Sequence, residues 1–321
     1  MKAIYCPAYG PAHLLQLKEV PVPEPKADEV LVRVMYSSVN AYDWHFYTGE
    51  PWLARFSFGL LRPNPSILGA DVSGIVEKTG RHVSAFQPGD RVVGEVTSGA
   101  WAEYVCVRAE RLTSLPVSVS LEQAAGMPMA GQTALQGLRN HARVQAGQKV
   151  LINGATGGVG TFSAQIARIL GAEVWAVCRT GNMELVKSLG ADHIIDYTRE
   201  DFRQMNMQWD VVLDNVGNIT RRQYEPLLQP DGTGIMIGFQ NMKTLMGIML
   251  RQRKKSGSGK PRVFSFTAEP NAADMAQLVA WAASGQLRSV ITKRFPLTEA
   301  AKAAALQQEG HVQGKLVLEI A

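Results

Sequence analysis

Residues 150–162 read Val-Leu-Ile-Asn-Gly-Ala-Thr-Gly-Gly-Val-Gly-Thr-Phe, and this stretch decides the fold of the chain. Its apolar run stops at Gly154, and a helical pattern begins just beyond Gly160. Glycines at 154, 157 and 160 allow the backbone to bend sharply and to approach a pyrophosphate, whose charge the positive end of the following helix stabilises. The stretch predicts a strand, a tight turn and a helix that together bind a dinucleotide.

The surroundings of the turn favour this interpretation over a structural turn that merely needs glycines. A helix is expected over Ser163–Leu170, and it leads into a second apolar run, Val174–Cys178. Strand, helix and strand in this order form a β-α-β unit, which is the context in which such a glycine turn binds dinucleotides.

The end of the second strand predicts NADP rather than NAD. An NAD site has an acidic residue there for the ribose 2′-hydroxyl, whereas an NADP site has a basic residue for the 2′-phosphate. No Asp or Glu lies between Trp175 and Met183, and Arg179 offers planar donors that suit a phosphate. Thr180 and Asn182 are expected to add neutral hydrogen bonds. The alternative is that Arg179 is an ordinary solvated residue at a strand end.

The composition is typical of a two-domain enzyme from a reducing compartment. The 321 residues exceed what one hydrophobic core usually organises. Cys6, Cys106 and Cys178 are far apart, which indicates neither a disulfide framework nor a four-thiolate zinc lobe. We recognise no signal peptide and no apolar run of ~20 residues, so we expect a soluble, cytoplasmic protein without a membrane span. The net charge of +5 is spread along the chain apart from Arg251–Lys255, so no nucleic-acid partner is expected.

The pattern of apolar residues predicts an α/β protein of two domains. Short strands separated by Gly and Pro turns dominate residues 1–122, which indicates an antiparallel β domain. Strands and helices alternate over 123–265, which indicates the nucleotide-binding domain, and residues 266–321 are expected to complete the first domain. The expected strands include Glu29–Val34, Gly74–Glu77, Asp90–Gly94, Glu103–Val107, Asp210–Asp214, Gly234–Gly238 and Lys315–Ile320, and the expected helices include Leu121–Gly126, Gln132–Asn140, Asn271–Ser284 and Glu299–Gln308.

Several motifs, spread over nearly the whole chain, resemble those of one family. They are Ser38-Val-Asn-Ala-Tyr-Asp-Trp44, Leu68-Gly-Ala-Asp-Val-Ser-Gly74, Phe86-Gln-Pro-Gly-Asp-Arg-Val92, Gly99-Ala-Trp-Ala-Glu-Tyr104, Met129-Ala-Gly-Gln-Thr-Ala134, the glycine turn, Leu189-Gly-Ala-Asp192 with Asp196-Tyr197, and His311-Val-Gln-Gly-Lys315. With them the chain resembles a zinc-independent medium-chain dehydrogenase/reductase of the quinone oxidoreductase (zeta-crystallin-like) branch. The resemblance implies a GroES-like catalytic domain, a doubly wound Rossmann domain, a substrate site between them and a homodimer.

Two departures from the zinc alcohol dehydrogenases of that superfamily indicate that this chain has no catalytic metal. Those enzymes have a ligand Cys where this chain has Asn40, and a ligand His where it has Ala70. Without a metal no Lewis acid polarises an alcohol oxygen, so dehydrogenation of simple alcohols is not expected. A different metal site built on His45, Asp43 and Asp71 is not expected either, because no ligand-rich spacing surrounds them.

Hydride transfer without a metal favours a small hydrophobic substrate that is already electrophilic, such as a quinone or an α,β-unsaturated carbonyl. The resemblance makes Asn40 a candidate hydrogen-bond donor to the developing oxyanion. His45 stands where relatives often have a Tyr and is a candidate proton donor, with delivery of the proton by water as the alternative. Asp43 completes the candidate catalytic set, although anchoring of the loop backbone is its more ordinary role.

The resemblance also implies a set of cofactor-binding residues. It places Thr133 near the nicotinamide phosphate, the glycine turn against the pyrophosphate, Arg179 at the 2′-phosphate and Tyr197 beside the adenosine. Thr133 could instead be a plain helix N-cap and Tyr197 a plain core residue. The complete set is Thr133, Gly154, Thr156, Gly157, Gly158, Val159, Arg179, Tyr197 and, at the nicotinamide end, Gly238 and Phe239.

Two segments are expected to shape the substrate cavity. The loop Tyr47–Pro65 is rich in aromatic residues, of which Trp52 and Phe56 are the pocket candidates. The apolar run Leu245–Arg253 adjoins basic residues, so it could form a lid or a membrane-surface patch, with ordinary helix packing as the alternative.

Together these expectations describe an NADPH-dependent, zinc-free reductase that transfers hydride to a quinone or an α,β-unsaturated carbonyl. An enoyl-thioester reductase is the alternative in the same class. The alternative from another class is a non-catalytic NADPH-binding or RNA-associated protein.

Overall fold

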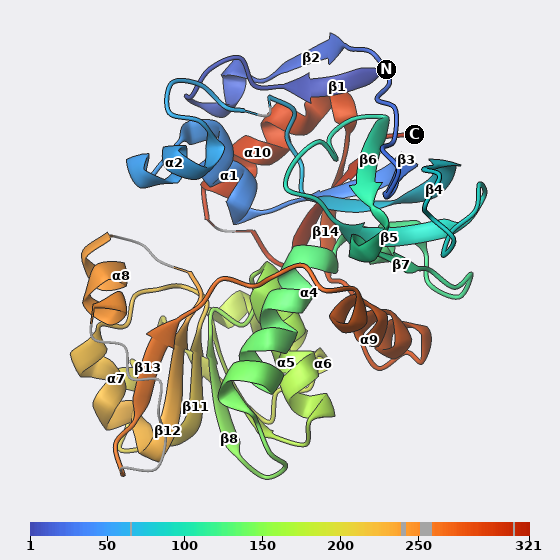
Figure 1. Ribbon diagram of the computed structural model, residues 1–321. Coiled ribbons are helices and arrows are strands. Elements are labelled where there is room, and N and C mark those ends of the chain that lie inside the picture. The colour runs from blue at the N-terminus through green and yellow to red at the C-terminus, as the bar shows by residue number, and fades with distance from the viewer. Residues whose placement is uncertain (65, 239–241, 251–258, 311) are drawn as a thin grey trace. The chain divides into compact units, whose positions relative to one another are not determined.

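The computed structural model describes residues 1–64, 66–238, 242–250, 259–310 and 312–321. These residues form two compact units (Figure 1). The first unit consists of residues 1–132 and 270–321, and the second consists of residues 133–269. The first unit therefore joins two segments that are far apart in the sequence. Among the described residues, no helix is both long and apolar enough to cross a bilayer.

The first unit is built on a largely antiparallel sheet. Its strands are β3 (Glu29–Val39), β4 (Asp71–Thr79), β5 (Arg91–Glu95), β6 (Tyr104–Arg108), β7 (Leu112–Ser114), β14 (Ile291–Pro296) and β15 (Lys315–Glu319). They follow the order β14-β15-β3-β4-β5-β7, and β6 also pairs with β3. The pairing of Leu316 with Val39 confirms that the closing strand returns to the beginning of the chain. The predicted GroES-like fold is confirmed.

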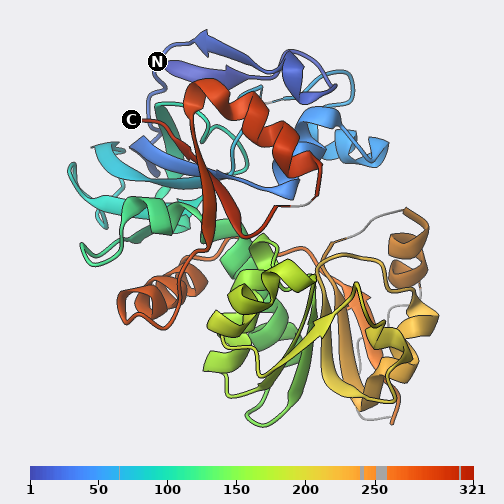
Figure 2. The same ribbon diagram turned by 180° about the vertical axis from the view of Figure 1, so that it is seen from behind.

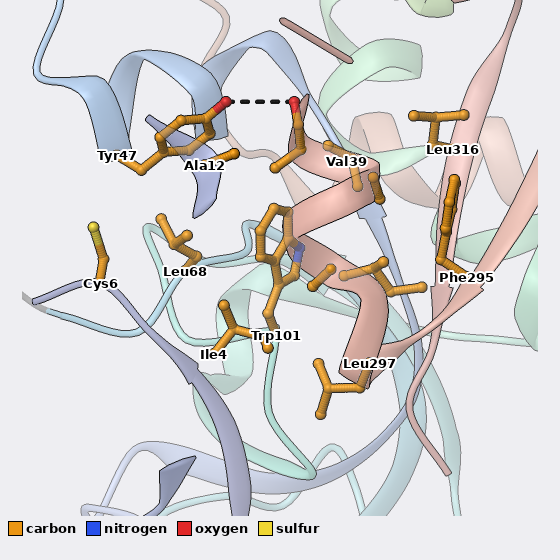
Figure 3. Close-up of a cluster of buried hydrophobic side chains, with 14 of the residues drawn as sticks. Ile4, Cys6, Ala12, Val39, Tyr47, Leu68, Trp101, Phe295, Leu297 and Leu316 are labelled. Atoms are coloured by element: carbon orange, nitrogen blue, oxygen red, sulfur yellow. Dashed lines mark hydrogen bonds between the residues drawn. The ribbon is translucent and has the colours of Figure 1, made fainter. Parts of the chain in front are cut away.

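One apolar cluster of the first unit joins α1 (Ala41–Thr48) and α10 (Ala300–Gln308), which lie side by side in Figure 2. Trp101 is fully buried and donates its indole N–H to the Ser38 carbonyl at 3.3 Å. The Tyr47 hydroxyl donates to the Ala304 carbonyl at 3.4 Å (Figure 3). This packing fixes the junction between β3 and α1. The labelled members of the cluster are Ile4, Cys6, Ala12, Val39, Tyr47, Leu68, Trp101, Phe295, Leu297 and Leu316.

The segment 47–65 is only partly the loop that the sequence predicted. A 3-10 helix covers Trp52–Ala54, and α2 follows over Arg55–Phe58. No proline or glycine interrupts residues 52–58, so short helical turns form there until Gly59 ends them with a φ of 111°. The loop prediction was therefore wrong for this part.

The second unit is a doubly wound parallel sheet. Its strands are β8 (Lys149–Asn153), β9 (Glu173–Cys178), β10 (His193–Asp196), β11 (Trp209–Asp214), β12 (Leu228–Met236) and β13 (Arg262–Ser265). The order β10-β9-β8-β11-β12-β13 reverses between β8 and β11, which Figure 1 shows side by side. In open α/β sheets, ligands bind outside the carboxyl ends of the strands at such a reversal. The predicted Rossmann fold is confirmed.

The helix predicted over 132–140 begins earlier than expected and changes from an α-helix to a π-helix along its length. α4 covers Pro128–Leu135 and continues as a π-helix over Gln136–Ala142, which ends at Arg143 with a φ of 55°. Pro128 suits the first turn of a helix, because that turn does not use the backbone N–H. Thr133 thus lies inside α4, and the alternative that it is an N-cap is wrong. The other α-helices are α3 (Leu121–Ala125), α5 (Gly158–Ile169), α6 (Met183–Ser188), α7 (Arg221–Leu227), α8 (Met242–Met249) and α9 (Ala272–Ala283).

Candidate active site

The glycine turn of the second unit lies between β8 and α5, and Gly157 is the N-cap residue of α5. A Cβ on Gly160 would lie 2.1 Å from the Gly154 carbonyl oxygen, so this position has room only for hydrogen. A Cβ on Gly157 would meet nothing closer than the same oxygen at 3.7 Å, so the space above the turn is open. Gly160 thus packs the helix against the turn, whereas Gly157 leaves room for a ligand at the positive end of α5. This arrangement fits the pyrophosphate of a dinucleotide.

The strand ends beside the turn provide the site expected for the adenosine. β9 and β10 are parallel, with Asp196 opposite Cys178, and the Tyr197 N–H donates to the Cys178 carbonyl at 3.0 Å. Arg179 and Tyr197 are therefore the first residues after the paired ends of two neighbouring strands. Arg179 is exposed and forms no ion pair with another described residue. Tyr197 is 57% exposed, so the alternative that it is a core residue is wrong.

The neutral donors expected beside Arg179 are used within the chain. The Thr180 hydroxyl donates to Asp196 Oδ2 at 2.5 Å, and the buried Asn182 donates its amide N–H to Thr156 Oγ1 at 3.4 Å. In this structure the Thr180 hydroxyl is therefore engaged by Asp196. Asp196 lies on the neighbouring strand and accepts this hydrogen bond. Arg179 is left as the predicted residue that can donate there.

A buried carboxylate holds the loop after β11, and sequence reasoning missed it. Asp214 is fully buried and accepts hydrogen bonds from Asn153 Nδ2 at 2.8 Å and from the Gly217 N–H at 2.9 Å. Burial raises the pKa of Asp214. A Cβ on Gly238 would lie 2.2 Å from the Asn215 carbonyl oxygen, so the ends of β11 and β12 pack closely. An acidic residue directly after the apolar run Val211–Leu213 was the available signal.

Two of the predicted ligand-contacting segments are described only in part. Phe239, predicted at the nicotinamide end, lies outside the described residues, as do Arg251 and Arg253 of the predicted lid. The described part of that run forms most of α8, which packs against β13 with Ile248 buried and Met249 exposed.

In the first unit, Asn40 lies at the junction of β3 and α1 with its side chain turned inward. Its backbone N–H donates to Asp43 Oδ2 at 2.8 Å. Its amide N–H donates to Asp71 Oδ2 at 3.0 Å, and its amide oxygen accepts a hydrogen bond from Lys315. Both ends of the amide are thus held by buried partners, including one from the far end of the chain.

Asp71 and Lys315 form a buried ion pair that the sequence did not indicate. Lys315 is 2% exposed and Asp71 is 0% exposed, with 3.5 Å between Lys315 Nζ and Asp71 Oδ2. Asp71 also accepts a hydrogen bond from the Ser37 hydroxyl at 2.6 Å through its carbonyl, and one from the Met129 N–H at 3.0 Å through its carboxylate. Burial lowers the pKa of Lys315. Lys315 belongs to a quoted motif and begins the expected closing strand, but no local pattern indicated a buried partner for it.

This cluster does not fit a catalytic zinc ion. Asn40 and Ala70 supply neither a thiolate nor an imidazole, and the Lys315 ammonium is bonded to Asn40. A second cation beside a buried ammonium is electrostatically unfavourable. No group of three or more His, Cys, Asp or Glu side chains suited to a metal ion exists within the part of the chain that the structure describes.

Asp43 lies in the third position of α1 and holds the beginning of the helix. It is 1% exposed, and burial raises its pKa to about 7 from an ordinary value of 3.8. The folded state therefore favours the protonated carboxyl. The contribution of Asp43 to the free energy of unfolding should decrease as the pH rises from about 4 to about 7. This behaviour fits a backbone anchor more closely than a group that must stay charged.

His45 is half-buried in α1, with its ring against that of Trp44 at 4.2 Å between centroids. Its Nδ1 lies 2.6 Å from the Glu50 carbonyl oxygen, and burial lowers its pKa. A carbonyl only accepts hydrogen bonds, so the neutral ring carries its proton on Nδ1. Trp52 and Phe56 follow on the next turns, 64% and 65% exposed, with 5.7 Å between their ring centroids.

Family models match both parts of this architecture. Residues 26–117 match the alcohol dehydrogenase GroES-like domain, and residues 189–318 match the zinc-binding dehydrogenase model. The chain belongs to the medium-chain dehydrogenase/reductase superfamily.

Similar proteins place the chain more closely within that superfamily. A chloroplast envelope quinone oxidoreductase homolog from Arabidopsis thaliana is 33% identical, over 99% of this chain and 98% of that protein. An NADPH-dependent alkenal/one oxidoreductase from the same plant is 30% identical, over 99% of this chain and 79% of its own. The solved quinone oxidoreductase from Coxiella burnetii has a TM-score of 0.87 at 30% identity, covering 100% of this chain and 99% of its own. The chain is a member of the quinone oxidoreductase branch.

Proposed function

We propose that the chain is an NADPH-dependent, zinc-free reductase that transfers hydride to a quinone or an α,β-unsaturated carbonyl. The observation that carries this proposal is the exposed Arg179 at the end of β9, beside an open glycine turn and with no Asp or Glu between Trp175 and Met183 in the sequence. Relatives named as quinone and alkenal/one oxidoreductases support the substrate class. The nicotinamide cofactor supplies the hydride when it is bound.

The residues around Asn40 do not fit a metal ion, so the chain acts by binding and orienting the cofactor and the substrate and by excluding bulk water. The turn amides at the beginning of α5 hold the pyrophosphate, and Arg179 binds the 2′-phosphate. The Asn40 amide is engaged by Asp71 and Lys315, so it shapes the wall of the site and a solvent molecule is the stronger candidate for the oxyanion donor. The proton also comes from solvent, because neutral His45 has its proton on Nδ1.

Oxidation of NADPH, followed at 340 nm against three substrate classes, tests this function. Quinones and short enones should be reduced faster than enoyl thioesters. Faster reduction of enoyl thioesters would favour the alternative reductase, which a relative named as a trans-enoyl reductase also represents. Cofactor binding without turnover of any class would favour a non-catalytic NADPH-binding protein.

Replacing Arg179 by Ala should remove most of the preference for NADPH over NADH. The change deletes a charge-assisted contact worth about 1.5–3 kcal/mol and leaves NADH binding almost unchanged. Calorimetric titration of both cofactors into both proteins measures the effect. Equal affinities in the wild type would contradict the NADP assignment, and an unchanged preference in R179A would place the phosphate elsewhere.

Replacing His45 by Phe should leave turnover within about threefold of the wild type at pH 7, because a ring of lowered pKa is neutral there. A loss of about 10²–10⁴-fold is the result expected of a proton donor instead. Steady-state kinetics from pH 5 to 9 separate the two cases. A limb of the wild-type profile that vanishes in H45F would return His45 to the mechanism.

A homodimer and a cytoplasmic location complete the proposal. Analytical ultracentrifugation tests the first. The compartment needs imaging in the source cell, since several relatives carry chloroplastic or mitochondrial names.

A further inference from the structure

The carboxyl ends of β9 and β10 bring two arginines to the same edge of the second unit. The register places Asp196 opposite Cys178, so Arg179 begins the segment after one strand and Tyr197 the segment after the other. Arg199 follows two residues after Tyr197. Its backbone N–H donates to the Asp196 carbonyl at 2.9 Å, which closes a turn. Tyr197, whose ring is exposed, therefore follows β10 where Arg179 follows β9, and Arg199 lies two residues further along the chain.

The Asp196 carboxylate lies at this edge and changes the charge that surrounds a bound phosphate. Asp196 accepts hydrogen bonds from the Thr180 hydroxyl at 2.5 Å and from the Thr198 hydroxyl at 2.7 Å. These bonds lower the pKa of Asp196, which therefore stays charged at neutral pH. A phosphate dianion beside Arg179 would thus face one positive and one negative charge, which is an unfavourable balance.

Arg199 supplies the second positive charge. Its Nε lies 3.5 Å from Asp196 Oδ2, while its side chain is 75% exposed. Only Nε of Arg199 contacts the carboxylate, so the two terminal guanidinium nitrogens of this exposed side chain can still donate hydrogen bonds to a ligand. The ion pair is too exposed to contribute much to folding, so its orientation is more informative than its stability.

We propose that Arg199 is a second binding residue for the adenosine 2′-phosphate, held in place by the Asp196 carboxylate and acting together with Arg179. This inference rests on the proposed use of NADPH. Asp196 and its two threonine hydroxyls then act as a support that positions Arg199, rather than as a ribose ligand.

The test uses Arg199→Gln, with Arg168→Gln as the matched control. Arg168 is also an exposed arginine, paired with Asp192 at 2.9 Å, but Asp192 precedes the amino end of β10. The Kd of NADPH and of NADH is measured for the full chain and each variant by fluorescence titration at fixed ionic strength. We expect R199Q to weaken NADPH about 3–10-fold and NADH less than twofold, and R168Q to change neither cofactor beyond twofold. Arg199→Lys should recover part of the loss.

The outcomes separate this inference from the proposed function. A wild-type protein without preference for NADPH overturns both. If neither R199Q nor R179A changes the wild-type preference for NADPH, the 2′-phosphate binds elsewhere and neither arginine has the proposed role. A preference that R179A removes but R199Q preserves overturns only the role of Arg199, and so does an equal loss of both cofactors in R199Q.

Discussion

Replacing Lys315 by Met should lower the free energy of unfolding of the first unit by about 3–5 kcal/mol, although Met nearly matches the volume of Lys. The reason is that the change leaves Asp71 as a buried charge without its cation and leaves the Asn40 oxygen without its donor. Removal of one partner of a buried ion pair is much more costly than replacement of both. The double variant K315M/D71N should therefore recover part of the loss. Urea unfolding monitored by tryptophan fluorescence measures these differences.

Lys302→Met is the matched control for this prediction. Lys302 lies 2.8 Å from Glu299 but is 71% exposed, so its loss should cost less than about 1 kcal/mol. Equal and small effects in K315M and K302M would show that the buried pair contributes little. The Asn40 side chain would then need another explanation for its orientation.

Replacing Gly160 by Ala should destabilise the second unit by about 3 kcal/mol or more and abolish cofactor binding. The new methyl group would lie 2.1 Å from the Gly154 carbonyl oxygen and 2.8 Å from the Ala155 backbone, so the turn or the helix must move. Thermal unfolding and NADPH titration of the same preparation measure both effects.

Gly157→Ala is the control within the same turn. Its methyl group finds space, and the N-cap change should cost about 0.5–1 kcal/mol. The same methyl group occupies the space open to the pyrophosphate, so NADPH affinity should decrease about 10–100-fold. Stability and affinity should thus separate in G157A and fall together in G160A. If G160A unfolds like the wild type, the turn is softer than this geometry implies.

The glycine turn and the β-α-β unit around it were predictable because their signals are local. Apolar runs, glycine spacing and the absent acid all lie within 30 residues of Gly154, and short-range sterics decide what they form. The return of the closing strand to the first domain was also predictable from the pattern of apolar residues, but its pairing with β3 was not.

The partners of Asn40 and Thr180 were not predictable, because they depend on tertiary register. Lys315 is 275 positions from Asn40, and Asp196 is 16 positions from Thr180 on another strand. No pattern within either segment specifies these contacts. Sequence reasoning therefore found the candidate residues but not the direction in which their polar groups point.

The placement of β15 also affects how the chain folds during synthesis. The strand lies between β14 and β3 and carries Lys315, yet it follows the whole second unit in the sequence. On the ribosome, residues 1–132 emerge without the ammonium that Asp71 and Asn40 require, whereas residues 133–269 form a continuous unit. The second unit can therefore mature first, and the nascent first unit must wait with an open sheet edge, the condition in which chaperones protect emerging chains from aggregation.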